Sequence, residues 1–234
     1  MLVRDCMTPN PATIEPEAGL DEALGLMRAL KVRHLPVLSG AALVGMLTWT
    51  DLMRAASPAT ALLGSVEFPA LLVKVHVKEV MTPEPITVSP ETPVEIAARV
   101  LRERKIGSLP VVEDRMLVGI VTETDLFDAL THLLGGDFRG VRMAVELPNG
   151  LADLVTLVQT LAPLLGVGKG ALTVTARLDA TSRRGYLRVS TGSPLVLAEA
   201  LAVAGLEVSH LHFEPPRRLS EPLRPGSPRS GSSR

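Results

Sequence analysis

The chain has 234 residues, which suits one large domain or two small ones, and 46% of them are hydrophobic, enough for a substantial core. Aromatic residues make up only 3%, which disfavours binding modes that stack bases on aromatic platforms. The 24 basic and 25 acidic residues give a formal charge of −1, which disfavours general electrostatic binding to nucleic acid or to a membrane. With no signal-peptide pattern and no apolar stretch long enough to span a bilayer, we expect a cytoplasmic protein.

An internal repeat organises the first half of the chain. Residues 3–55 align with residues 77–129 at a constant offset of 74 and without a gap. The segments that recur include Met7-Thr8-Pro9 as Met81-Thr82-Pro83, Leu35-Pro36-Val37 as Leu109-Pro110-Val111, Leu43-Val44-Gly45 as Leu117-Val118-Gly119, and Thr50-Asp51-Leu52 as Thr124-Asp125-Leu126. We therefore assign residues 1–56 and 77–134 to two repeats, and residues 57–76 to a linker.

Each copy predicts the same order of elements. In the first copy an extended segment over residues 7–16 leads to a helix, because apolar residues from Leu20 to Leu30 recur at helical spacing. Two short strands follow over residues 35–38 and 43–47, and a second helix starts near Thr48. A β-α-β-β-α unit of ~50 residues buries little surface alone, so we expect the two units to pack as a pseudo-two-fold pair of α/β (α+β) class.

Thr48-x-x-Asp51 and Thr122-x-x-Asp125 are the most informative positions of the repeat. One interpretation is a helix capping box, in which the threonine and the acid satisfy backbone N–H groups at a helix N-terminus. The other is a ligand site, because a helix N-terminus after a strand suits phosphate, and a carboxylate can hold the two hydroxyls of a ribose. The duplication of the motif behind two equivalent strands favours the ligand site.

These motifs together resemble the cystathionine-β-synthase (CBS) domain pair, over residues 3–129. The resemblance implies a regulatory site for AMP, ADP, ATP or S-adenosylmethionine rather than a catalytic cofactor. It implies that phosphate and ribose are contacted by Thr48, Asp51, Thr122 and Asp125. It implies that the base-side walls are formed by Thr13, Ile14, Arg33, His34, Thr87, Val88, Gly107 and Ser108.

The two predicted clefts differ in charge and shape. Trp49 stands in the first motif where Glu123 stands in the second, and Glu123 would repel a triphosphate. We group Arg33 and His34 with the first motif, which makes the first cleft the more cationic and the better site for a charged phosphate tail. The alternative for Arg33 and His34 is simple exposure at a strand edge.

After a glycine-rich boundary at residues 135–140, the pattern changes to β-α-β-β-α-β over residues 141–213. The predicted elements are strands over 142–147, 171–178, 186–190 and 206–213, and helices over 151–165 and 194–204. This ferredoxin-like order resembles the ACT domain, a family of small-molecule sensors, although Leu147-Pro148-Asn149-Gly150 lacks the aspartate of the usual D-x-P-G turn. A CBS pair followed by an ACT-like domain resembles the acetoin-utilisation AcuB-type proteins, which implies control of acetoin or acetate metabolism.

His210 and His212 share one face of the last predicted strand, but no further ligand pattern accompanies them, so we expect no metal site. Residues 214–234 are rich in Pro, Ser, Gly and Arg, and we expect a disordered tail. We find no nucleophile–base pair, metal cluster or cofactor loop in the sequence, so we predict a non-catalytic regulator. The resemblances to the CBS pair and to the ACT domain imply a homodimer and a regulated protein that is unknown. A structural scaffold whose ACT domain binds an amino acid is the main alternative; an enzyme or a DNA-binding regulator is less favoured.

Overall fold

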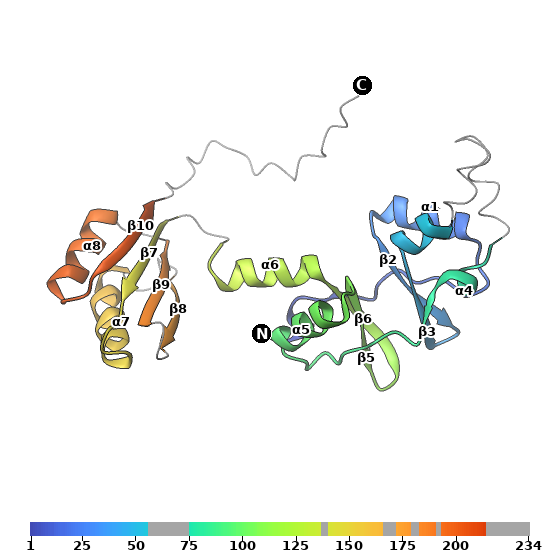
Figure 1. The fold of residues 1–234 in the computed structure, drawn as a ribbon, viewed down its shortest axis with the longest axis horizontal. Coiled ribbons are helices and arrows are strands. Elements are labelled where there is room, and N and C mark those ends of the chain that lie inside the picture. Colours follow the sequence, from blue (N-terminus) through green and yellow to red (C-terminus); the bar gives the residue numbers. More distant parts are fainter. Residues whose placement is uncertain (56–74, 137–139, 166–171, 179–182, 191–192, 214–234) are drawn as a thin grey trace, which may run out of the picture. The chain divides into compact units, whose positions relative to one another are not determined.

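The computed structural model describes residues 1–55, 75–136, 140–165, 172–178, 183–190 and 193–213 (Figure 1). The chain divides into two compact units, Met1–Ala129 and Leu130–Arg234, which we describe separately. Most of the predicted linker and the whole predicted tail lie outside the described residues. Across the described segments, no helix is both long and apolar enough to cross a membrane.

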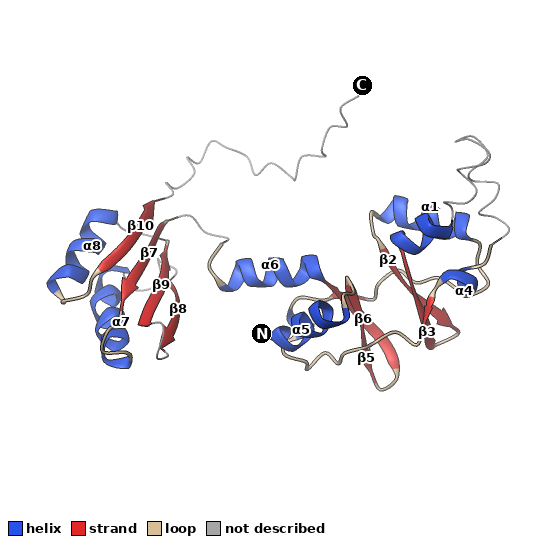
Figure 2. Cartoon of the chain, in the orientation of Figure 1, coloured by secondary structure: helices blue, strands red, loops and turns tan. Residues whose placement is uncertain are grey.

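The first unit contains both repeats, and each has the predicted β-α-β-β-α order (Figure 2). The first repeat consists of η1 (Val3–Asp5), β1 (Thr8–Pro9), α1 (Leu20–Leu30), β2 (His34–Ser39), β3 (Ala42–Thr48) and a helix that includes residues 49–55. The second consists of α4 (Val77–Val80), β4 (Thr82–Pro83), α5 (Val94–Arg104), β5 (Ser108–Glu113), β6 (Met116–Thr122) and α6 (Glu123–Leu133). The hairpin strands extend one residue beyond the prediction at each end.

Helical spacing of apolar residues explains why α1 packs where it does. Leu20, Leu24 and Met27 are buried on one face of α1, and they pack against the β2–β3 hairpin in the core of the first repeat. The helix ends at Lys31, which adopts a left-handed conformation, and α5 ends in the same way at Lys105. At each lysine the chain therefore makes a sharp turn between the helix and the strand that follows it.

The repeats exchange their first strands. The sheets run β2-β3-β4 and β1-β6-β5, so β4 completes the sheet of the first repeat and β1 completes the sheet of the second. The glycine of each Leu-Val-Gly segment allows this pairing, because the Met81 side chain covers Gly45 and the Met7 side chain covers Gly119. The recurring Met-Thr-Pro and Leu-Val-Gly segments are thus partners across the pair.

The second unit is a four-stranded antiparallel sheet covered on one face by two helices (Figure 1). Its elements are β7 (Val141–Glu146), α7 (Leu151–Leu165), β8 (Leu172–Leu178), β9 (Arg183–Val189), α8 (Pro194–Val203) and β10 (Val208–Phe213). The sheet order is β10-β7-β9-β8, and the predicted β-α-β-β-α-β order is confirmed. The third strand begins at Arg183, three residues before the predicted start.

Candidate ligand-binding clefts

Both Thr-x-x-Asp motifs form the same hydrogen-bonded turn at a helix N-terminus. Asp125 Oδ2 accepts hydrogen bonds from the Thr122 backbone N–H at 2.7 Å and from Thr122 Oγ1 at 2.8 Å. The Asp125 N–H donates to Thr122 Oγ1 at 3.3 Å. Thr48 and Asp51 repeat the three bonds at 3.0, 2.6 and 3.2 Å. The capping box is therefore real, and each box fixes the carboxylate at the mouth of a cleft.

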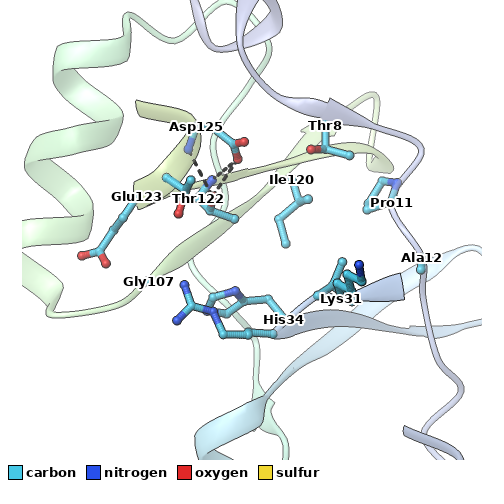
Figure 3. A pocket seen from close by; sticks show the side chains of 13 residues that line it. Thr8, Pro11, Ala12, Lys31, His34, Gly107, Ile120, Thr122, Glu123 and Asp125 are labelled. Atoms are coloured by element: carbon cyan, nitrogen blue, oxygen red, sulfur yellow. Dashed lines mark hydrogen bonds between the residues drawn. The ribbon is translucent and has the colours of Figure 1, made fainter. Parts of the chain in front are cut away.

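The cleft beside Asp125, which we call the Asp125 cleft, has a volume of about 320 Å³. Figure 3 shows Thr122 and Asp125 on one side, facing Lys31 and His34 of the first repeat. The remaining lining residues are Thr8, Pro11, Ala12, Val32, Arg33, Gly107, Ile120, Glu123 and Thr124. The cleft therefore lies between the Thr-x-x-Asp motif of the second repeat and two segments of the first repeat: the segment after β1 and the turn between α1 and β2.

The cleft beside Asp51, which we call the Asp51 cleft, is formed by the corresponding segments with the two repeats interchanged. Its volume is about 480 Å³. Thr48 and Asp51 of the first repeat face the second repeat's Lys105. The remaining lining residues are His34, Met46, Thr50, Arg54, Thr82, Glu84, Pro85, Ile86, Ile106, Gly107 and Ser108. Arg54 lies 3.8 Å from Asp51 Oδ1, so this cleft carries a cation next to its carboxylate.

His34 lies on the wall that the two clefts share. It lines both clefts, and its Nε2 would be 3.1 Å from a Cβ atom on Gly107, so only a glycine fits opposite the ring without displacing it. Burial and the neighbouring Arg33 lower the pKa of the His34 imidazole, against the opposing effects of Glu123 and Asp51. The ligand-free protein therefore favours neutral His34.

The structure corrects the predicted grouping of the walls. Arg33 lines the Asp125 cleft and not the Asp51 cleft with which the sequence analysis grouped it, so the predicted excess of positive charge in the first cleft is wrong. Trp49 packs against the core of the first repeat and lies outside the residues that line either cleft. The physical reason is the strand exchange, which turns each motif toward the walls of the other repeat.

Other predicted wall residues also lie elsewhere. Ile14 is 5% exposed and forms a bridge to Val37, and Val88 forms the equivalent bridge to Val111. Neither they nor Thr13 and Thr87 line the two clefts, whereas Gly107 and Ser108 do. Several other lining residues were not predicted from the sequence, although they recur at the same offset of 74: Thr8 with Thr82, Pro11 with Pro85, and Lys31 with Lys105.

Comparison with known proteins identifies the first unit. The CBS domain model matches residues 3–58 and 77–132. A CBS domain-containing protein of Dictyostelium discoideum is 33% identical over 137 residues, which cover 57% of this chain and 94% of the relative. The chain belongs to the CBS-domain family. Two enzymes also match: an inosine-5'-monophosphate dehydrogenase of Korarchaeum cryptofilum (34% identical over 167 residues, 71% of this chain) and a homoserine O-acetyltransferase of Methanohalobium evestigatum (31% over 126 residues, 53%).

This chain covers only 31% and 23% of those two enzymes, so the similarity says nothing of catalysis here.

Two solved structures resemble the CBS pair. A Vibrio cholerae protein assigned to acetoin utilization (AcuB) is 31% identical, with 58% of this chain and 95% of that chain covered and a TM-score of 0.49. CBSX2 of Arabidopsis thaliana, solved in complex with AMP, is 33% identical, with 56% and 97% covered and a TM-score of 0.48. Among the described residues, no group of three or more His, Cys, Asp or Glu side chains could hold a metal ion.

Proposed function

We propose that this protein is a non-catalytic regulator whose CBS pair binds adenosine nucleotides in the Asp125 and Asp51 clefts. The observation that carries the proposal is the duplicated helix N-terminus, with its fixed carboxylate, facing a lysine of the other repeat across each cleft. Free backbone N–H groups and the helix dipole favour a phosphate at this place. The ligand would contact both repeats at once, so its binding would favour one packing of the pair over another.

The carboxylate has one oxygen left for a ribose. Both bonds from Thr122 reach Oδ2 of Asp125, which leaves Oδ1 to accept from a ribose hydroxyl. On the opposite side, Val32 in one cleft and Ile106 in the other supply an apolar surface for adenine. The arrangement therefore provides separate contacts for phosphate, sugar and base.

The two clefts should prefer different phosphate tails. Glu123 is the first residue of α6 and lines the Asp125 cleft, where it would repel the distal phosphates of a triphosphate. The equivalent residue of the other repeat, Trp49, packs against the core of that repeat. Each cleft is lined by two cations, Lys31 and Arg33 beside Asp125 and Lys105 and Arg54 beside Asp51, so the acid at the helix N-terminus distinguishes the clefts. We infer that the Asp51 cleft takes the longer phosphate tail, and the Asp125 cleft takes AMP or S-adenosylmethionine.

The proposal extends to the second unit and to the assembly. The β-α-β-β-α-β order is the order of an ACT domain, so we propose that this unit receives or adds a second signal. The sequence resemblance supports a homodimer, an unidentified regulated protein, and a role in acetoin or acetate metabolism. A cytoplasmic location belongs to the same proposal.

Isothermal titration calorimetry of the full chain with AMP, ADP, ATP and S-adenosylmethionine tests the proposal. We expect saturable binding of at least one compound, with one cleft lost in Asp51→Ala and the other in Asp125→Ala. Asp21→Ala is the matched control, because Asp21 is an exposed acid in the first turn of α1 and lines neither cleft. Folding of each variant is checked by circular dichroism, since loss of a cap costs about 1 kcal/mol.

Three results would overturn the proposal. Absence of binding by the folded wild-type protein would make the CBS pair a structural scaffold. Binding that survives in both single variants and in the double variant would place the nucleotide elsewhere in the chain. Turnover of any of these compounds, abolished by Asp51→Ala or Asp125→Ala, would instead make the protein an enzyme.

A further inference from the structure

One histidine lies on the wall between the two clefts of the first unit. His34, the first residue of β2, lines both the Asp125 cleft and the Asp51 cleft. Its counterpart at the offset of 74 is Ser108, which lines the Asp51 cleft alone. Among the described residues only His34 and Gly107 line both clefts, so His34 is the one titratable group on their shared wall.

Hydrogen bonds connect this wall to both helix N-termini. The carbonyl oxygen of Arg33, the residue before His34, accepts from the Trp49 N–H at 2.8 Å, where the last helix of the first repeat begins. The carbonyl oxygen of Gly107 accepts from the Glu123 N–H at 3.2 Å, where α6 begins. The His34 ring lies against Gly107 (Figure 3). A chain of direct contacts through the ring therefore joins the two Thr-x-x-Asp motifs.

The fixed charges around the ring balance. The cations that line the two clefts are Lys31, Arg33, Arg54 and Lys105, and the acids are Asp51, Glu84, Glu123 and Asp125. Burial, followed by the charge of Arg33, lowers the pKa of the His34 imidazole, against the opposing effects of Glu123 and Asp51. One more negative charge in either cleft would therefore shift the ring toward its protonated form.

We propose that His34 couples the two clefts: an anionic nucleotide in either cleft favours the protonated ring, and the protonated ring strengthens the binding of a second anion in the other cleft. This inference rests on the function proposed above and adds the regulation of the same site. A phosphate in either cleft lies within roughly 10 Å of the shared wall, where opposite charges still attract. The two ligands repel each other, and the charge gained by the ring offsets that repulsion. The coupling is reciprocal, so each ligand strengthens the other by the same factor.

Calorimetric titration of the full chain with AMP measures this coupling. At pH 7 we expect the ratio of the second to the first stepwise affinity to be about fivefold higher in the wild type than in His34→Ser, which copies the residue of the other repeat. At pH 9 the ring stays neutral even beside a ligand, so the two proteins should give the same ratio. His212→Ser is the matched control, because His212 is an exposed histidine of the second unit that lines neither cleft.

Proton uptake shows whether both clefts act on the same ring. The titrations at pH 7, repeated in two buffers of different ionisation enthalpy, give the protons taken up for each AMP bound. The AMP phosphate itself titrates at about pH 6, so the uptake that belongs to His34 is the difference between proteins with and without the imidazole. We expect this uptake in Asp125→Ala, in which the Asp51 cleft still binds, and in Asp51→Ala, in which the Asp125 cleft still binds. It should be smaller in Asp51→Ala, because the Asp51 carboxylate favours the charged ring.

The outcomes separate this inference from the function on which it rests. Absence of binding of AMP, ADP and ATP to the folded wild-type protein would overturn the inference, and absence of S-adenosylmethionine binding as well would overturn the proposed function with it. AMP binding with the same affinity ratio in the wild type and in His34→Ser at pH 7 would overturn the inference alone. So would AMP binding or proton uptake confined to one cleft.

A measurement on the wild-type protein keeps the test decisive if His34→Ser does not fold. Nuclear magnetic resonance follows the titration of the five histidine rings of the chain with and without AMP. We expect AMP to raise the pH at which one of these rings titrates and to leave the other four unchanged. Titration of all five rings at the same pH in both states would refute the coupling.

Discussion

Replacing Gly119 by alanine probes the contact through which the two CBS repeats exchange strands. A Cβ atom at this position would lie 2.6 Å from Met7 Sδ and 3.1 Å from the Thr8 carbonyl oxygen. The methionine can move, but the backbone of β1 is held by its pairing with β6. Gly25 in α1 is the matched control, because it is exposed and a Cβ atom there would meet nothing within 4 Å.

The two substitutions should have opposite signs. An extra methyl group in a well-packed site costs about 1–3 kcal/mol, and replacing glycine in a regular element offsets about 0.5–1 kcal/mol of that. We therefore expect Gly119→Ala to lower the free energy of unfolding by about 1–2 kcal/mol. Gly25→Ala should raise it by about 0.5–1 kcal/mol, because only the helix-propensity effect remains.

Urea unfolding followed by tryptophan fluorescence measures this. Trp49 is the only tryptophan of the chain and packs against the core of the first repeat, so its signal reports on the first unit. The same measurement in a Met7→Ala background completes a double-mutant cycle, in which the cost of Gly119→Ala should fall because the sulfur is gone. An unchanged cost in that background, or a Gly119→Ala protein as stable as the wild type, would refute the proposed contact.

Two further predictions concern the clefts. The pKa of native His34 lies below its unfolded value of about 6.5, so the unfolded chain takes up a proton first as the pH falls, and the ligand-free protein loses stability below about pH 6.5. His34→Ser, which copies Ser108 of the other repeat, should reduce the decrease in the free energy of unfolding between pH 7.5 and 5, as measured by urea unfolding. The same pH dependence in the variant and in the wild type would contradict the assignment of this loss to His34. Thr122→Ala should lower the free energy of unfolding by about 1 kcal/mol through loss of the cap, while Thr124→Ala, two residues further on, should cost less. Equal losses in chemical denaturation would argue against the cap.

The elements were predictable because local patterns determine them. Apolar spacing placed α7 at Leu151–Leu165 as the structure has it, and the repeat alignment placed both β-hairpins to within one residue. The Thr-x-x-Asp turns were also predictable, since a cap involves only residues three apart. These features depend on short stretches of chain, which a single sequence contains in full.

The partners of those elements were not predictable in the same way. A repeat with a constant offset looks identical whether Met7 packs on Gly45 of its own copy or on Gly119 of the other, and only the structure distinguishes these. The misplacement of Arg33 followed directly from this ambiguity. The placement of Trp49 could not be predicted for a different reason, because a large apolar residue at a helix start fits a core as well as a ligand site.

The strand exchange also has a consequence for biosynthesis. The Thr8–Pro9 strand leaves the ribosome before its partners Gly119 and Ile120, which follow more than a hundred residues later. At usual elongation rates this strand waits roughly 5–20 s without a partner. The edge of β3 likewise waits for Thr82 and Pro83, so a nascent first repeat exposes an unpaired sheet edge that chaperones or another nascent chain can reach. A premature stop before β4 would therefore leave the sheet of the first repeat incomplete, and a stop between β4 and β6 would leave β1 without its partner.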